Sequence, residues 1–190
     1  ILAKLTQAQY RNTVRDLFGE DVVVPGGLEP DTESDGLYAV GASIASVSPL
    51  GAERYADSAR SIASQIVEST EILASVTDCS PDTQDVGPCL KTMVETLGKN
   101  IWRRPVTASE NAALVALGQQ AKDTLGSYKD GVEYVISAML QSPYFLYRVT
   151  FGEASEEDTG LRRYSNWELA SRLSYFLWNT LPDSDLMEAA

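Results

Sequence analysis

Residues 165–183 read Ser-Asn-Trp-Glu-Leu-Ala-Ser-Arg-Leu-Ser-Tyr-Phe-Leu-Trp-Asn-Thr-Leu-Pro-Asp, which belongs to the most informative part of the chain. It begins with a capping box, in which the Ser165 hydroxyl accepts a backbone N–H of the first turn and the Glu168 carboxylate reaches back. Leucines recur every four residues, so they share one helical face; they are Leu169, Leu173, Leu177 and Leu181. Pro182 disfavours helix at the residue before it. The stretch predicts an α-helix over 165–181, with core packing as the simplest role for its apolar face.

The aromatic residues of this helix suggest a second role. They extend the apolar surface on both sides of the leucines, and they are Trp167, Tyr175, Phe176 and Trp178. A helix that is apolar around most of its circumference is normally buried on most sides. A further helix begins at Asp183, and we expect the chain to be a piece of a longer protein. We therefore expect these four residues to contact a second chain or the remainder of that longer protein. The alternative is that helices within residues 108–150 cover this surface.

The rest of the chain shows the same kinds of helix-start and periodicity signals. Capping boxes at Thr6 and Thr107 begin helices over 6–18 and 107–125, and Ser48 followed by proline begins one over 49–76. Apolar spacing predicts two more, over 90–102 and 132–141, and no period-two pattern predicts a strand. Residues 19–47, rich in Gly, Pro, Asp and Ser, form a long loop. We expect an all-α, irregular bundle of about seven helices, divided into an N-terminal region (1–78), a cysteine and arginine–proline region (79–106) and a C-terminal region (107–190).

Composition excludes several functions. The chain has 190 residues with 27 acidic and 15 basic side chains, and a net charge of −12. Such a surface repels nucleic acid and anionic lipid, and no segment approaches the roughly 20 apolar residues that insertion across a membrane requires. Histidine is absent, which removes the commonest general base and transition-metal ligand and excludes Ser-His-Asp catalysis within this chain. No residue is assigned a catalytic role, and no carboxylate spacing supports a hydrolase.

The two cysteines, Cys79 and Cys89, enclose a loop rich in Pro, Gly and Asp. Turn residues let the thiols face each other, so the loop favours a disulfide. Two free buried thiols or half of a metal site are the alternatives. A disulfide indicates an oxidising compartment and therefore a periplasmic or secreted protein.

Two further charge patterns suggest ligands. The segment from Asp31 to Gly36 resembles the front of a calcium-binding EF-hand loop, with Asp31, Glu33 and Asp35 as candidate ligands. Its twelfth position lacks the expected glutamate, so a solvated turn is the alternative. Arg148 and Arg172 lie within apolar sequence, where they either pair with Glu168 or bind an anion, and structural pairing is the simpler expectation.

Four segments of sequence, the last of them in two stretches, together resemble one protein family. They are Leu5-Thr-Gln-Ala-Gln-Tyr-Arg-Asn-Thr-Val-Arg-Asp-Leu-Phe-Gly19, Gly36-Leu-Tyr with Val47-Ser-Pro-Leu50 and Tyr55, Trp102-Arg-Arg-Pro-Val-Thr107 with Glu110, Ser142-Pro-Tyr-Phe-Leu-Tyr-Arg148, and Glu168-Leu-Ala-Ser-Arg-Leu-Ser-Tyr-Phe-Leu-Trp178. The chain is similar to large secreted proteins of unknown function from planctomycetes and myxobacteria, which often end in a cytochrome c-like domain.

This resemblance implies the N-terminal helical half of an extracytoplasmic, c-type cytochrome-linked protein that acts in electron transfer or as an oxidoreductase. Such proteins attach haem c through Cys-x-x-Cys-His in their C-terminal part, and that motif is absent here. We therefore expect this module to be non-catalytic by itself and to bind no haem or transition metal. The alternative is a binding or assembly module that recognises a polymer or docks to the remaining part of the protein.

Overall fold

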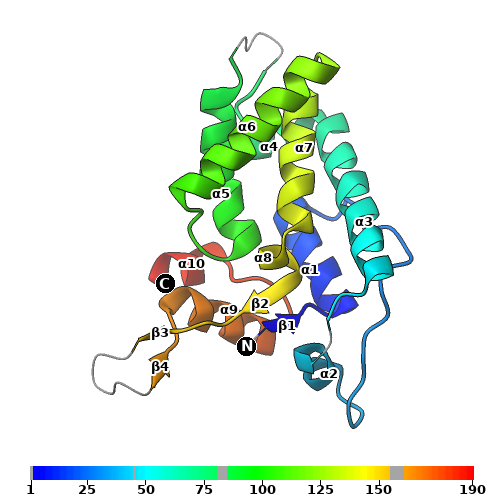
Figure 1. Ribbon diagram of the computed structural model, residues 1–190, viewed down its shortest axis with the longest axis vertical. Coiled ribbons are helices and arrows are strands. Elements are labelled where there is room, and N and C mark those ends of the chain that lie inside the picture. Colours follow the sequence, from blue (N-terminus) through cyan, green and yellow to red (C-terminus); the bar gives the residue numbers. More distant parts are fainter. Residues whose placement is uncertain (1, 45, 81–84, 155–160) are drawn as a thin grey trace.

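The computed structural model describes residues 2–44, 46–80, 85–154 and 161–190 of the chain. Helices dominate the described residues (Figure 1), as the sequence predicts. The elements in chain order are β1 (Leu2–Lys4), α1 (Gln7–Phe18), α2 (Tyr38–Ile44), α3 (Pro49–Glu68), α4 (Thr70–Val76), α5 (Gly87–Trp102), α6 (Ala108–Leu125), α7 (Tyr128–Gln141), α8 (Pro143–Leu146), β2 (Tyr147–Val149), β3 (Glu153–Ala154), β4 (Arg162–Arg163), α9 (Asn166–Leu177) and α10 (Ser184–Ala189).

The described residues form ten helices rather than about seven, and the extra ones are short. The helix predicted over residues 49–76 is two helices, because Ser69 ends α3 and its hydroxyl accepts the N–H of Ile72 to begin α4. The single turn α8 begins at Pro143, and α2 lies inside the predicted loop. The helix predicted to reach Leu181 ends at Leu177, since the chain turns at Asn179, where φ is 59°.

The capping boxes predicted for α1, α6 and α9 are all present. In the α6 box, Glu110 also pairs with Arg104, whose Nη2 lies 2.7 Å from Oε1 and whose Nη1 lies 3.0 Å from Oε2. The hydrogen bonds from Arg104 lower the pKa of Glu110 from its ordinary value of 4.5 to about 2, against an opposing effect of desolvation. This carboxylate therefore joins the arginine–proline segment to the start of α6.

The Glu110 pKa predicts a pH-dependent contribution to stability. A depressed folded-state pKa stabilises the fold above pH 4.5, and this contribution is lost as the pH falls toward 2. The Glu110→Gln variant should therefore be less stable than the wild type at pH 7, and the difference should shrink steadily below pH 4.5. Urea unfolding at pH 7, 4.5 and 3 measures it, with Glu53→Gln on the exposed side of α3 as the control. A difference as large at pH 3 as at pH 7 would contradict the assignment.

The described chain contains two small strand pairs that the sequence does not predict, and the first of them joins distant parts of it. β1 pairs antiparallel with β2, with Leu2 opposite Val149 and Lys4 opposite Tyr147, and β3 pairs with β4. Strands of two or three residues are too short to show an alternating pattern. The β1–β2 pair places the beginning of the described chain at the same end of the molecule as α9 (Figure 1).

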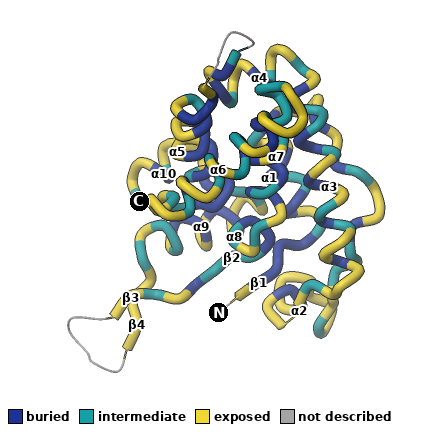
Figure 2. The backbone as a smooth tube through the Cα atoms, turned by 45° about the horizontal axis from the view of Figure 1, so that its top comes forward, coloured by how far each residue is buried: buried dark blue, intermediate teal, exposed yellow. Residues whose placement is uncertain are grey.

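The core is built around α7. This helix packs against α3, α5 and α6, and it buries Val132, Val135, Ile136, Met139 and Leu140. The core cluster extends from Leu5 to Tyr175, so the three sequence regions contribute to one core. Figure 2 shows buried residues at the centre of the bundle and exposed ones along α2 and the β3–β4 arm.

No helix in the described part of the chain is both long enough and apolar enough to span a lipid bilayer.

The predicted disulfide is confirmed: Cys79 and Cys89 are bonded, with their Cα atoms 5.4 Å apart. Residues 81–84 of the enclosed loop lie outside the described residues. The bond closes a short loop between the end of α4 and the first turn of α5. It therefore fixes the connection between the N-terminal region and α5.

We expect the Cys79→Ser/Cys89→Ser double variant to lose about 2.5–3 kcal/mol of unfolding free energy. A cross-link that closes a loop of this length lowers the conformational entropy of the unfolded chain, and the lost entropy corresponds to about that free energy. Urea unfolding measures the loss. Peptide mapping of the protein from its native compartment, without reductant, should recover the two cysteines as one linked pair. Two freely alkylatable thiols would contradict both the bond in vivo and the oxidising compartment.

Candidate docking site

Helix α9 is anchored by the carboxylate of Glu168. Oε1 accepts the backbone N–H groups of Phe151 (2.7 Å) and Gly152 (3.0 Å), and Oε2 accepts that of Ser165 (3.0 Å). Desolvation by burial raises the pKa of Glu168, but the N–H groups of Gly152, Ser165 and Phe151 outweigh it and leave the pKa lowered. The predicted ion pair between Glu168 and Arg172 is wrong, since it is not among the ion pairs of the described residues. Both carboxylate oxygens of Glu168 accept backbone N–H groups instead.

The buried face of α9 is not the leucine face. Ala170, Ser171, Ser174 and Tyr175 point into the protein, and the Tyr175 hydroxyl lies 2.9 Å from the Thr13 hydroxyl of α1. Small side chains let a helix backbone approach its neighbours closely, and the tyrosine fills the remaining space. The expectation that the leucines are core residues is therefore wrong for this helix.

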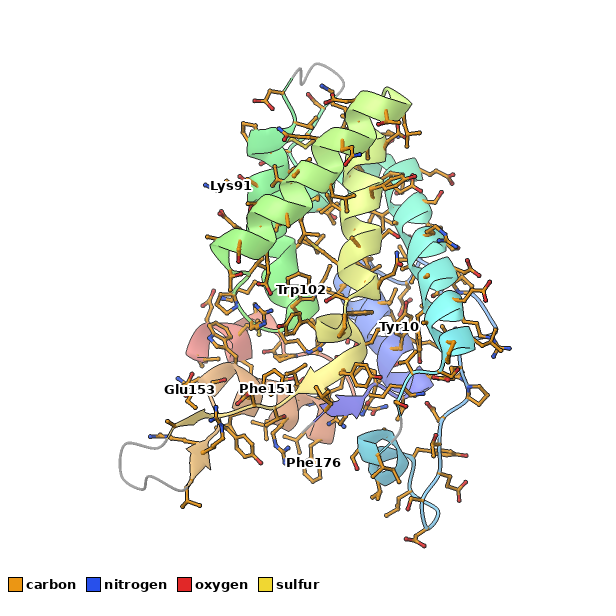
Figure 3. The ribbon with its side chains drawn as sticks, viewed as in Figure 1. Tyr10, Lys91, Trp102, Phe151, Glu153 and Phe176 are labelled. Carbon is orange, nitrogen blue, oxygen red and sulfur yellow. A yellow bond between two sulfur atoms is a disulfide. The ribbon has the colours of Figure 1, made fainter. Side chains whose placement is uncertain are left out.

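The leucine face is exposed to solvent. Leu169, Leu173 and Leu177 are about half exposed, and Phe176 beside them is 82% exposed. Figure 3 shows Phe176 at the same end of the molecule as β1 and α2. Contiguous exposed apolar residues are uncommon on monomeric proteins and mark interaction surfaces. We call Leu169, Leu173, Phe176 and Leu177 the α9 face.

The four predicted docking residues lie in different environments. Phe176 belongs to the α9 face, whereas Tyr175 is only 3% exposed and cannot contact a partner directly. Trp178 is exposed and lines a separate hollow of about 480 Å³ beside Asp16 of α1. Trp167 is half-buried, with the Lys99 ammonium 4.8 Å from its ring centroid. The structure thus brings Phe176 together with the leucines, and not with the other aromatics.

A hollow of about 560 Å³ adjoins the α9 face. Two arginines, Arg148 of β2 and Arg172 of α9, line it together with apolar side chains of the α9 face. We call it the two-arginine hollow, and its lining residues are Ala3, Ser43, Arg148, Thr150, Leu169, Arg172, Leu173 and Phe176. It therefore lies where β1, α2, β2 and α9 meet.

Arg148 occupies an unusual environment in this hollow. Its guanidinium lies 5.5 Å from the centroid of the Tyr175 ring, and its Nε is buried with no hydrogen-bond partner in the described part of the protein. Burial lowers the pKa of Arg148, the Tyr175 hydroxyl opposes this, and the neighbouring charges of Arg103 and Arg172 lower it further. Among the described residues, no carboxylate is one of these influences.

Arg103 holds the backbone that leads into β2. It is 4% exposed, and its Nη2 donates to the carbonyl oxygens of Tyr144 (2.6 Å), Phe145 (3.2 Å) and Tyr147 (2.9 Å). These carbonyls belong to α8 and the start of β2. Arg103 therefore fixes the strand that carries Arg148, a role that the sequence did not reveal because its partners lie about 40 residues away.

The candidate calcium ligands do not form a metal site in the described residues. The Asp31 carboxylate accepts the N–H of Gln7 at the start of α1, at 2.9 and 3.1 Å, while Glu33 and Asp35 are exposed. No group of three His, Cys, Asp or Glu side chains gathers as metal ligands in the described ranges. Asp31 instead fastens the long loop to the first helix.

Three family models match the chain, one after another. Residues 4–68 match PSD3, a protein of unknown function (DUF1587), residues 89–149 match PSD5, a protein of unknown function (DUF1595), and residues 164–190 match PSD4, a protein of unknown function (DUF1592). No curated protein and no solved structure shows a significant match. The PSD4 match includes α9, and the PSD5 match includes Arg103 and Arg148. The chain is thus an all-α module that matches the PSD3, PSD5 and PSD4 models in succession, with Arg148 of the two-arginine hollow in the second of these matches along the chain and α9 in the third.

Proposed function

We infer that this chain is a non-catalytic docking module that binds a polypeptide partner, or another region of the same polypeptide, through the α9 face. The observation that carries this is the exposure of an entire apolar helix face, with Phe176 at 82%. Burying such residues stabilises a complex by roughly 25 cal/mol per Å² of apolar surface before the costs of association. Large aromatic side chains at the centre of a face are also typical anchors of interfaces.

An extracytoplasmic location, periplasmic or secreted, is part of the proposal. The Cys79–Cys89 disulfide supports it, because such bonds persist in oxidising compartments. The resemblance to secreted proteins that often end in a cytochrome c-like domain supports a link to a c-type cytochrome. The protein from its native source should then show the visible absorption and added mass of covalently attached haem, and a haem-free intact protein would refute this link.

Site-specific cross-linking in the native host tests the docking function. A photo-cross-linking amino acid replaces Phe176, and the control replaces Tyr134, a 47% exposed aromatic residue of α7. We expect position 176 to cross-link to one defined polypeptide segment and position 134 not to do so. Identifying that segment by mass spectrometry and reconstituting its binding with purified components completes the test. Equal, diffuse labelling from both positions would reject the proposal.

A further inference from the structure

We propose that the two-arginine hollow binds a carboxylate side chain of the partner polypeptide, with Arg148 and Arg172 pairing the carboxylate and the α9 face receiving an adjacent apolar side chain. This inference rests on the proposed docking function and names the chemistry of the partner. The recognised segment is an aspartate or glutamate next to a large apolar residue.

The first argument is electrostatic. The chain carries a net charge of −12, yet the ion pairs among its described residues include neither Arg148 nor Arg172. The charges of Arg103 and Arg172 both act on Arg148. Both charges act unfavourably on the Arg148 cation in the free protein. A bound negative charge removes that repulsion, which a neutral ligand or a water molecule does not.

The second argument is the unused donor on Arg148. Its Nε–H is buried without an acceptor in the described structure, and an unmet buried donor costs free energy. The guanidinium presents its N–H groups in a planar fork that matches the two oxygens of a carboxylate. A carboxylate that draws the guanidinium toward the hollow therefore satisfies the donor and the charge together.

The third argument is the mixed lining of the hollow. Leu169, Leu173 and Phe176 line it beside the two arginines and also form most of the α9 face. Apolar walls suit a ligand that brings an apolar group with its charge, whereas a free inorganic anion would lose hydration against them. Because the hollow and the face share these three residues, one segment of a docked polypeptide can occupy both.

Two capped synthetic peptides test the inference: acetyl-AFEFA-amide and its glutamine counterpart acetyl-AFQFA-amide. Binding is followed by two-dimensional ¹H–¹⁵N NMR, which observes the Arg148 Nε–H directly as well as the backbone amides of α9. We expect the glutamate peptide to bind at least about tenfold more tightly, since hydrogen bonds to charged groups are the strong ones, and to shift the Arg148 Nε–H resonance. Added salt should reduce the difference.

Variants and competing ligands complete the experiment. Arg148→Gln and Arg172→Gln should each abolish the preference for glutamate, and Arg163→Gln, at an exposed arginine of β4, should preserve it. Arg172 is exposed, so its variant remains informative if Arg148→Gln unfolds. Equal binding of the two peptides, an unchanged preference in Arg172→Gln, or binding of hexanoate or inorganic phosphate without the glutamate peptide would each overturn the inference.

The docking function and the carboxylate inference fail in different ways. A defined cross-link at position 176 together with equal binding of the two peptides would remove only the carboxylate. A clear glutamate preference without a defined cross-link would leave the hollow as an anion site and remove the docking function.

Discussion

Replacing Arg103 with glutamine is expected to lower the free energy of unfolding by about 4 kcal/mol, because it leaves two buried and two part-buried backbone carbonyls without this donor, each at a cost of up to roughly 1–3 kcal/mol. Arg103 donates to the carbonyls of Tyr144, Phe145 and Tyr147 and, through Nη1, to that of Ile101 (3.1 Å). A loss of this size is a large share of the 5–15 kcal/mol that typically holds a domain together.

Thermal and urea unfolding measure the effect, and the neighbouring residue supplies a matched control. Arg104 is more exposed and pairs with Glu110, so Arg104→Gln should cost about 1 kcal/mol or less, as surface pairs do. The melting temperature should fall by about 8–16 °C for Arg103→Gln. If the two variants were equally stable, the backbone around α8 and β2 would not depend on Arg103, and its role in holding β2 would be wrong.

The helix starts could be predicted from the sequence because capping is local. Ser165 and Glu168 meet within one turn, and the same holds for Thr107 with Glu110. The disulfide was predictable for a similar reason, since ten residues separate Cys79 from Cys89. In each case the interacting groups are close along the chain, so their spacing specifies the contact.

The orientation of α9 could not be predicted in this way. Its leucines recur with helical period, and the pattern shows that they share a face but not which face meets the core. The choice depends on Tyr175 reaching Thr13, 162 residues away, and on the small residues beside it. The loss of the Glu168–Arg172 pair has the same origin, because Glu168 bonds the backbone at Phe151 and Gly152, a contact no helical spacing reveals.

These long-range contacts create the candidate site. Tyr175 turns the leucines outward, and Arg103 places β2 so that Arg148 borders the same hollow. One sequence signal does remain: no aspartate or glutamate lies within four residues of Arg148 in the sequence. An arginine in an apolar segment without a nearby carboxylate thus deserves to be considered as an anion-binding residue, in preference to the structural pairing expected from the sequence alone.

The α9 face yields the prediction with the largest effect on binding. In the Leu173→Ser/Phe176→Ser double variant, we expect the affinity for the partner segment identified by cross-linking to fall at least about 100-fold, since anchor residues at an interface each contribute 2 kcal/mol or more. The unfolding free energy should change by no more than about 0.5 kcal/mol, because these side chains are 43% and 82% exposed in the folded chain.

The combination of these two results separates a docking surface from a core. Calorimetric titration with the purified partner segment measures the affinity, and urea unfolding measures the stability of the same samples. The control Leu125→Ser/Tyr134→Ser removes two apolar side chains of comparable exposure, 54% and 47%, from α6 and α7, and it should leave both quantities unchanged. A large loss of stability in the α9 variant would identify the face as part of the folded core, and retained affinity would move the docking surface elsewhere. A variant that loses affinity for the partner segment but keeps its unfolding free energy is expected only if the leucines and Phe176 contact the partner and not the core.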